Sequence, residues 1–141
     1  MASPLPVRIW RESQPRFLSI LRIMAAFVFI QYGTAKLFAW PVAMGPHGPV
    51  ALMSQMGLAG VLETFGGGLL LVGLFTRPLA FLLCGEMAVA YFQNHVPRGF
   101  WPLANGGVPP VLFCFIWLYI SAAGPGPWSL DALLRRTEAS R

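Results

Sequence analysis

The chain has 141 residues, of which 56% are hydrophobic and 11% are charged, whereas an ordinary soluble domain has about a quarter charged residues. This composition excludes a water-soluble fold with a polar surface and favours a single domain in a lipid bilayer. The formal net charge of +5 does not indicate a nucleic-acid partner, because the Lys and Arg residues lie mostly at the chain ends and in connectors, not in a basic stripe interleaved with aromatics.

Four apolar stretches follow one another along the chain, and each is close to the roughly 20 residues that a helix needs to cross the hydrocarbon core. They predict an all-α fold, a four-helix transmembrane bundle with spans at about 17–38, 57–75, 78–95 and 108–124. The first stretch is too long for a removable signal peptide and lacks a small-residue cleavage site. Residues 1–16 then form an N-terminal segment, residues 17–124 a membrane domain, and residues 125–141 an interfacial tail.

The basic residues predict the orientation of this bundle. Four spans place both termini on one side of the membrane, and the positive-inside rule assigns the side with most Lys and Arg to the cytoplasm. Only Lys36 and Arg98 lie near the opposite face. We therefore expect both termini to be cytoplasmic. The basic residues on their side are Arg8, Arg11, Arg16, Arg77, Arg135, Arg136 and Arg141.

The connectors between the spans differ in length. Residues 75–78 predict a tight inner turn with Pro78 in the first turn of the next helix, so the second and third spans are expected to form an antiparallel hairpin. The outer loops, at 39–56 and 96–107, are longer and rich in Pro, Gly and aromatics, and we expect them to fold over the outer mouth of the bundle. After the last span, Ser129 is the predicted N-cap of a short helix along the inner interface.

Cysteine usage gives no sign of a redox centre. Cys84 and Cys114 are the only cysteines, and at 1.5 Å per residue they lie about 9 Å inside opposite faces of the membrane. We therefore expect two small buried thiols and no disulfide. The chain has no CxxC, haem-attachment or metal-ligand spacing, so neither a metal site nor a covalently bound cofactor is predicted.

Ionisable residues inside the spans are costly and are by default candidates for function. Along the first span, Arg22 and Lys36 recur on one helical stripe near opposite ends of the helix. In the second span, Glu63 shares a face with Gly60 and Gly67, whose small size lets a neighbouring helix approach closely. These stripes are expected to face the interior of the bundle.

Depth and helical phase predict two ion pairs inside the bundle. Lys36 and Glu63 both lie in the outer half of the membrane, whereas Arg22 and Glu86 lie in the inner half and the middle. One interpretation gives both pairs a structural role, because buried pairs can specify an arrangement without adding stability.

The functional interpretation is an outer-facing polar pocket. Lys36 and Glu63 would line it, with His95 at the end of the third span and Asn105 closing over it as further ligand-binding residues. Because histidine exchanges protons near neutral pH, Glu63 and His95 are the candidate catalytic groups for the proton transfer that accompanies quinone reduction. The alternative for His95 is a structural role at the level of the lipid headgroups.

The motifs of the chain, taken in order, are similar to those of the DoxX family of small bacterial membrane proteins. The resemblance covers about residues 17–134 and rests on RIMAAFVFIQYGTAKLF (22–38), LAGVLETFGGGLLLVGLFTRP (58–78), AVAYFQNHVPRGFWPLANGG (88–107) and GPGPWSLDALL (124–134). It implies a four-helix bundle in the bacterial inner membrane. The positions that match the family motifs are Gly33, Lys36, Glu63 with the glycines after it, Arg77, His95, Asn105, Gly106 and Gly107.

The chain departs from the family pattern after the Asn-Gly-Gly turn. Relatives often have an acidic residue there, whereas this chain has Val108, so any proton or ligand role of that acid is absent or moved. The prolines that follow, Pro109 and Pro110, predict an irregular start to the fourth span, with its free backbone groups satisfied by water or by the loop.

The resemblance implies a quinone-interacting membrane subunit of a redox system that acts with a partner protein. One member resembles a subunit of thiosulfate:quinone oxidoreductase, and others are linked to thiol and oxidative stress. The alternative is a non-enzymatic scaffold or assembly factor, whose glycines pack against a partner protein or a second copy of the chain. A transporter is disfavoured because no inverted repeat is evident. The glycines predicted to pack between helices are Gly33, Gly60, Gly66 and Gly67.

Overall fold

The computed structural model describes residues 5–45 and 48–140, and within these residues the fold is all-helical, without a strand. Residues 1–4, 46–47 and Arg141 lie outside the described part of the chain. Two helical stretches are long and apolar enough to cross a membrane, Val7–Phe38 with mean hydropathy 1.6 and Gln55–Val72 with mean hydropathy 1.3. The predicted third span is divided between two shorter helices, and the fourth corresponds to the shorter apolar helix Val108–Ala123.

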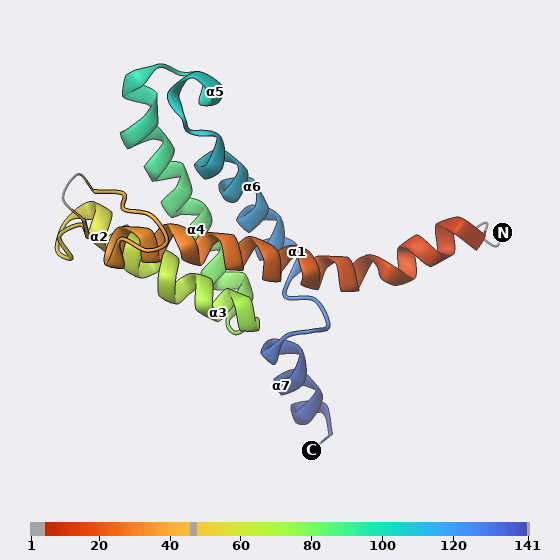
Figure 1. Cartoon of the computed structure of the whole chain (residues 1–141). Coiled ribbons are helices and arrows are strands. Elements are labelled where there is room, and N and C mark those ends of the chain that lie inside the picture. The colour runs from red at the N-terminus through yellow and green to blue at the C-terminus, as the bar shows by residue number, and fades with distance from the viewer. Residues whose placement is uncertain (1–4, 46–47, 141) are drawn as a thin grey trace.

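The first helix, α1 (Leu5–Phe38), begins well before the apolar stretch that predicted it and passes through Pro15 without a break. A proline inside a helix removes one backbone donor. In Figure 1 the N-terminal part of α1 projects from the rest of the molecule. The 1–16 segment is therefore helical where it is described.

The second predicted span is one continuous helical run that lies antiparallel along α1 (Figure 1). It consists of α2 (Gln55–Val61), the π-helix η1 (Leu62–Gly66) and α3 (Gly67–Val72). The predicted packing glycines allow this close approach. A Cβ atom at Gly33 would lie 2.6 Å from the Thr64 amide nitrogen, and one at Gly67 would lie 2.7 Å from Cγ1 of Ile30.

The tight inner turn is present between α3 and α4 (Thr76–Ala90). Gly73 adopts the left-handed conformation, with φ of 73°, which glycine adopts without strain. Asp131, from the helix α7 (Leu130–Ala139), accepts hydrogen bonds from the amides of Phe75 and Thr76, each at 2.9 Å. The predicted N-cap of α7 is also present, because Ser129 Oγ accepts from the Ala132 amide at 3.1 Å.

The fourth helix, α6 (Val108–Ala123), starts regularly at Val108. The predicted irregular start is therefore wrong. The reason is that Pro109 and Pro110 lie in the first turn, where a backbone N–H would make no hydrogen bond within the helix, so its absence in proline has no cost. Between α4 and α6 the outer connection is built from the π-helix η2 (Tyr91–His95), the short η3 (Val96–Arg98) and α5 (Pro102–Asn105).

The helices pack as two pairs, α1 with the α2–η1–α3 run and α4 with α6. Figure 1 shows that α4 diverges from α3 after the turn, and that the second pair crosses the first at an angle. The expected hairpin of the second and third spans is thus present from the turn to the level of Gly66 and Leu83, and the two helical runs separate beyond it. The core lies where the pairs cross, and Phe29 packs there on Phe113 and Trp117, with ring centroids 5.0 and 5.3 Å apart.

The two cysteines lie side by side in the α4–α6 pair, with their Sγ atoms 3.7 Å apart and both thiols free. The prediction that they lie at different depths is wrong. Because α6 has only 16 residues, it is about 24 Å long, and Cys114 is about as far from the inner end of α6 as Cys84 is from the inner end of α4.

Large apolar side chains cover the outside of the helices. Their exposure matches a surface in contact with lipid and not with water. Those at least half exposed include Phe17, Phe27, Phe65, Phe81, Phe92, Leu112 and Phe115.

Candidate functional site

The structure brings together Lys36 and Glu63, as the helical stripes predicted. Lys36 Nζ lies 2.5 Å from Glu63 Oε1, and the two side chains are 11% and 3% exposed. Lys36 is in the last turn of α1 and Glu63 is in η1. The helices approach closely here because Gly60 has no side chain, and a Cβ atom at that position would lie 3.1 Å from Lys36 Cβ.

A second carboxylate, Glu86, belongs to the same cluster. Leu83 of α4 packs over Gly66, and because the two helices run in opposite directions, one turn further along α4 lies level with Glu63. The charges of Glu63 and Lys36 act on Glu86 through space. We name Lys36, Glu63 and Glu86 the acid–lysine cluster. Lys36 binds Glu63 Oε1, whereas Glu86 has no hydrogen bond to the ammonium group.

The acid–lysine cluster has unsatisfied hydrogen-bonding capacity. Glu63 Oε2 and both side-chain oxygens of Glu86 are buried and have no hydrogen-bond partner among the described residues. The same holds for Thr64 Oγ1 and Trp117 Nε1. Buried polar atoms are nearly always hydrogen-bonded, so the free oxygens of Glu63 and Glu86 keep the capacity to take up a proton or to bind a polar ligand.

The π-helix η1 contributes to the position of Glu63. A π-helical turn inserts one residue into the regular helix and thereby rotates the side chains that follow, and such turns occur frequently at functional sites. Glu63 lies inside η1, and a second π-helix, η2, ends at His95. Both candidate catalytic residues are therefore in π-helical segments, which the sequence did not predict.

The predicted Arg22–Glu86 pair is wrong. Arg22 is fully buried and donates to carbonyl oxygens, to Pro125 at 2.8 Å, Leu71 at 2.7 Å, Trp128 at 2.5 Å, and also to Leu70. The physical reason is that α3 ends near Arg22 and leaves carbonyl groups without helical partners. A guanidinium group has five donors, so it satisfies these carbonyls and the 125–128 loop together.

The predicted polar pocket with His95 and Asn105 does not form around Lys36 and Glu63. His95 Nδ1 lies 3.1 Å from the Asn105 carbonyl oxygen and 3.1 Å from Arg98 Nη2. The side chain of Asn105 donates to Gly99 O at 2.7 Å and accepts from the Gly107 amide at 2.7 Å. The outer loop thus uses both residues for its own backbone, and neither is hydrogen-bonded to the acid–lysine cluster.

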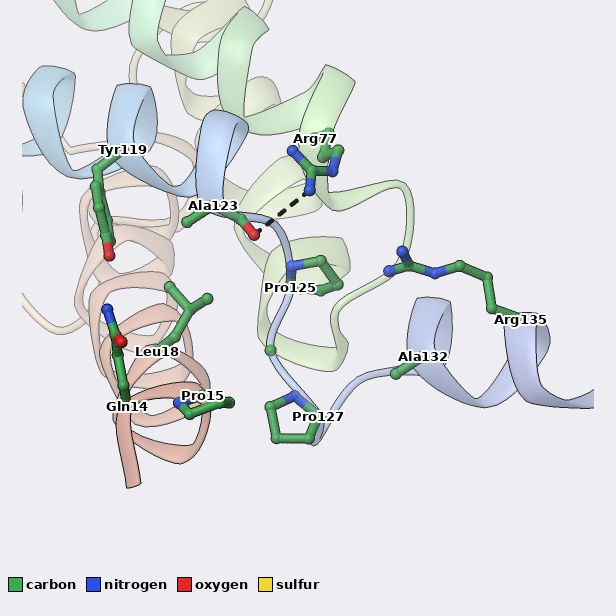
Figure 2. A pocket seen from close by; sticks show the side chains of 11 residues that line it. Gln14, Pro15, Leu18, Arg77, Tyr119, Ala123, Pro125, Pro127, Ala132 and Arg135 are labelled. Atoms are coloured by element: carbon green, nitrogen blue, oxygen red, sulfur yellow. Dashed lines mark hydrogen bonds between the residues drawn. The ribbon is translucent and has the colours of Figure 1, made fainter. Parts of the chain in front are cut away.

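Among the cavities in the described part of the chain, two lie at different places on the molecule. An apolar groove of about 440 Å³ runs between α1 and α6, and its walls include Met24, Val28, Tyr32 and Leu112. A pocket of about 500 Å³, shown in Figure 2, lies at the other end of α1, where Gln14, Arg77, Tyr119 and Arg135 line it. Arg77 there donates to Ser121 O at 3.1 Å and Ala123 O at 3.4 Å, and so joins the start of α4 to the end of α6.

No metal site is evident in the part of the chain that the structure describes, because no three His, Cys, Asp or Glu side chains converge there. Outside the predicted spans, Asp131 is the acid with a perturbed pKa. Burial alone would raise the pKa of Asp131, but hydrogen bonds from Thr76 and Phe75 and the charge of Arg135 outweigh it and hold the pKa below its ordinary value. Asp131 is therefore a charged helix cap.

Comparisons with known proteins agree on one family. The DoxX family model matches residues 17–96. An uncharacterized protein of Haemophilus influenzae is 45% identical over 122 residues, which cover 84% of this chain and 90% of that protein. Uncharacterized membrane protein Rv3486 of Mycobacterium tuberculosis is 28% identical (96% and 91% covered), and inner membrane protein YphA of Escherichia coli is 29% identical (84% and 91% covered). No solved structure matches the chain significantly.

Proposed function

The chain belongs to the DoxX family, and on this premise we propose that it is a four-span protein of the bacterial inner membrane that binds a quinone as a membrane subunit of a redox system. In this proposal residues 17–124 form the membrane domain, and both termini lie in the cytoplasm. The names of two relatives, a membrane protein and an inner membrane protein, support the location. The redox role implies a partner protein that donates electrons, because the described residues suggest no redox centre beyond the two thiols.

The unpartnered oxygens of the acid–lysine cluster are the observation that supports a quinone ligand. Three carboxylate oxygens of Glu63 and Glu86 are buried without a partner beside one lysine. A quinone has carbonyl oxygens that accept hydrogen bonds, and its reduced form has two hydroxyl groups that donate them. Lys36 or a protonated carboxyl would donate to the oxidised form, and the free carboxylate oxygens would accept from the reduced form.

The apolar side of the proposed site is the groove between α1 and α6. Tyr32 lines this groove and precedes Lys36 by one helical turn on α1. Ligand sites are typically apolar cavities with a few convergent polar groups, and the groove has a volume suited to a ring with part of an isoprenoid tail. When bound, a quinone would supply two-electron chemistry coupled to two protons, and Glu63 and Glu86 would hold and release those protons.

The test is the retention of a quinone by variants that neutralise one acid. Protein purified in detergent is equilibrated with decylubiquinone, and bound quinone is counted by mass spectrometry. Glu86→Gln is expected to reduce bound quinone about tenfold, the effect of losing one charged hydrogen-bonding group. Glu138→Gln, which neutralises an exposed acid on α7, is the matched control and should leave retention unchanged. Equal retention of decylubiquinone by the parent protein, Glu86→Gln and Glu138→Gln would contradict the proposal.

The scaffold alternative loses the observation that motivated it. Gly33, Gly60, Gly66 and Gly67 all face neighbouring residues of the same chain, so they are used for packing inside the molecule. Gly68 is the glycine of the second helical run with open space around its Cβ position, and a single open position on that run does not make a partner surface. If the quinone proposal holds and the scaffold alternative does not, a variant such as Gly68→Leu should leave the set of co-purifying proteins unchanged.

A further inference from the structure

The pocket at the inner end of the molecule has no role in the proposed quinone site. Its distance from the acid–lysine cluster is on the order of 30 Å, the length of α1 between Gln14 and Lys36 at 1.5 Å per residue. Five segments build it. Its walls come from α1 (Gln14, Pro15, Leu18), the end of α6 (Tyr119, Ala123), residues 125–127, Arg77 of α4 and Arg135 of α7.

The pocket is held in shape by hydrogen bonds between the segments that build it. Arg22 binds the carbonyl oxygens of Pro125 and Trp128, and Ser19 Oγ accepts from the Trp128 amide at 3.2 Å. On the other side, Asp131 attaches α7 to the start of α4. The loop that forms the floor is thereby fixed at several points, so the pocket is preformed and a ligand would need little rearrangement of the chain.

The charge of the pocket is positive. Arg77 and Arg135 line it together with the polar groups of Gln14 and Tyr119, and no acidic side chain is among its lining residues. Figure 2 shows Arg135 extending from α7 toward the loop from one side, with Gln14 and Tyr119 on the other. The nearby acid, Asp131, is turned to the amides of Phe75 and Thr76.

Arg135 is the guanidinium group that is free to bind. Its Nε donates to Asp131 O at 3.2 Å, while no hydrogen bond from its two terminal nitrogens is present within the described residues. Arg77 is largely committed to the carbonyls at the end of α6. A guanidinium group with free terminal nitrogens matches the geometry of a phosphate group, which it binds through two parallel hydrogen bonds.

We propose that this pocket binds the phosphate of an anionic phospholipid in the inner leaflet of the membrane. The walls favour a lipid over free phosphate, because Leu18, Ala123 and Pro127 give the cavity an apolar side and about 500 Å³ is far more than one phosphate needs. Exposed leucines of α7, Leu130, Leu133 and Leu134, lie beside it and would enter the interface. The inference rests on the proposed orientation of the chain in the membrane, but not on the quinone site.

The experiment compares two neighbouring arginines of the same helix. Arg135 lines the pocket and Arg136 does not, and both are exposed. Arg135→Gln and Arg136→Gln therefore remove the same charge at almost the same place. The full chain is reconstituted in nanodiscs of phosphatidylglycerol and phosphatidylcholine and then extracted, and native mass spectrometry counts the lipids that remain bound. Arg135→Gln should retain about tenfold less phosphatidylglycerol, whereas Arg136→Gln should match the parent protein.

Several results would overturn the proposal. An equal loss in both variants would mean that general surface charge attracts the lipid. Equal retention of phosphatidylcholine and phosphatidylglycerol by the parent protein would exclude selection for the anionic headgroup. Binding of inorganic phosphate to the lipid-free protein at least as tightly as phosphatidylglycerol, with loss of that binding in Arg135→Gln, would identify a free anion as the ligand. Retention of decylubiquinone is measured on the same samples, and an unchanged value in Arg135→Gln separates this site from the quinone proposal.

Discussion

Two groups of charged residues in this molecule are built in opposite ways. At the inner end, Arg22 and Asp131 use their hydrogen-bonding atoms on the backbone, with Arg22 bound to four carbonyl groups and Asp131 bound to two amides. In the acid–lysine cluster, Lys36 binds one oxygen of Glu63, and three carboxylate oxygens lack a partner among the described residues.

This difference separates a structural role from a ligand-binding one. A buried charge whose donors or acceptors are all satisfied holds segments of the chain together, and it has no capacity left for a ligand. A buried charge with free oxygens has that capacity, at a cost in stability. Charge inside the membrane is therefore not by itself the sign of a functional site, and the unsatisfied hydrogen-bonding atoms are the better guide.

The largest effect is expected from the inner group. Arg22→Met replaces the guanidinium by an apolar side chain and leaves the carbonyls of Leu70, Leu71, Pro125 and Trp128 without a donor. Each unsatisfied buried group is costly, so the free energy of unfolding should fall by about 3–5 kcal/mol. Thermal unfolding in detergent, followed by circular dichroism, measures the change.

Arg16→Met is the control for this variant, because Arg16 lies on the same helix, is exposed and makes no side-chain hydrogen bond or ion pair within the described residues. It should leave the unfolding free energy within about 0.5 kcal/mol of the parent protein. If Arg22→Met is as stable as Arg16→Met, the carbonyl network does not hold the inner end together, and the comparison between the two groups fails.

A smaller effect is expected in the acid–lysine cluster. Lys36→Met removes the ammonium group and leaves Glu63 buried beside Glu86 without a compensating charge. Breaking a buried ion pair on one side typically costs about 3–5 kcal/mol, and we expect about 3 kcal/mol here because Glu63 can take up a proton. The measurement is again unfolding in detergent.

The double variant Lys36→Met with Glu63→Gln sharpens this prediction. Removing both charges should recover most of the lost stability, because no unpaired charge then remains. Bound decylubiquinone should stay low in the double variant, since the polar groups of the site are gone. A double variant that is as unstable as Lys36→Met alone would show that packing, and not the ion pair, accounts for the effect.

The sequence predicted the helices and the Lys36–Glu63 contact for the same reason. Apolar runs and helical stripes follow from the spacing of residues along the sequence and the period of the α-helix. Lys36 and Glu63 lie on such stripes at the same depth, with glycines between the two helices. The contact of α1 with the second helical run follows from these features. The position of Glu86 beside Glu63 did not, because it depends on how far α4 tilts away from α3 after the turn.

The errors at Arg22, His95 and Asn105 have one physical origin. Helical stripes and depth predict which side chains share a face or a level, whereas the structure satisfies these three residues largely with backbone carbonyls and amides. Backbone groups become free at helix ends and in loops, and a sequence does not show which side chain will reach them. The π-helical turns at Glu63 and His95 are hidden for the same reason.

The smallest effect is expected from Asp131, the helix cap of the inner group. Asp131→Asn retains the shape of the side chain but replaces one acceptor oxygen by a donor, so one of the two amides at the start of α4 loses its partner. Loss of a cap costs about 1 kcal/mol, reduced here because the side chain is partly exposed. Glu138→Gln on the same helix is the control and should have no effect.

The pH dependence of this difference identifies the charge of Asp131 as its cause. Because the pKa of Asp131 is lowered in the folded protein, the ionised form stabilises the fold fully above the unfolded-state pKa of about 3.9. This stabilisation is lost as the pH falls through the folded-state value. The stability difference between the parent protein and Asp131→Asn should therefore be constant near neutral pH and shrink in acid. A difference that persists at low pH would assign the effect to shape and not to charge, and Asp131 would then no longer count among the satisfied charges of the inner end.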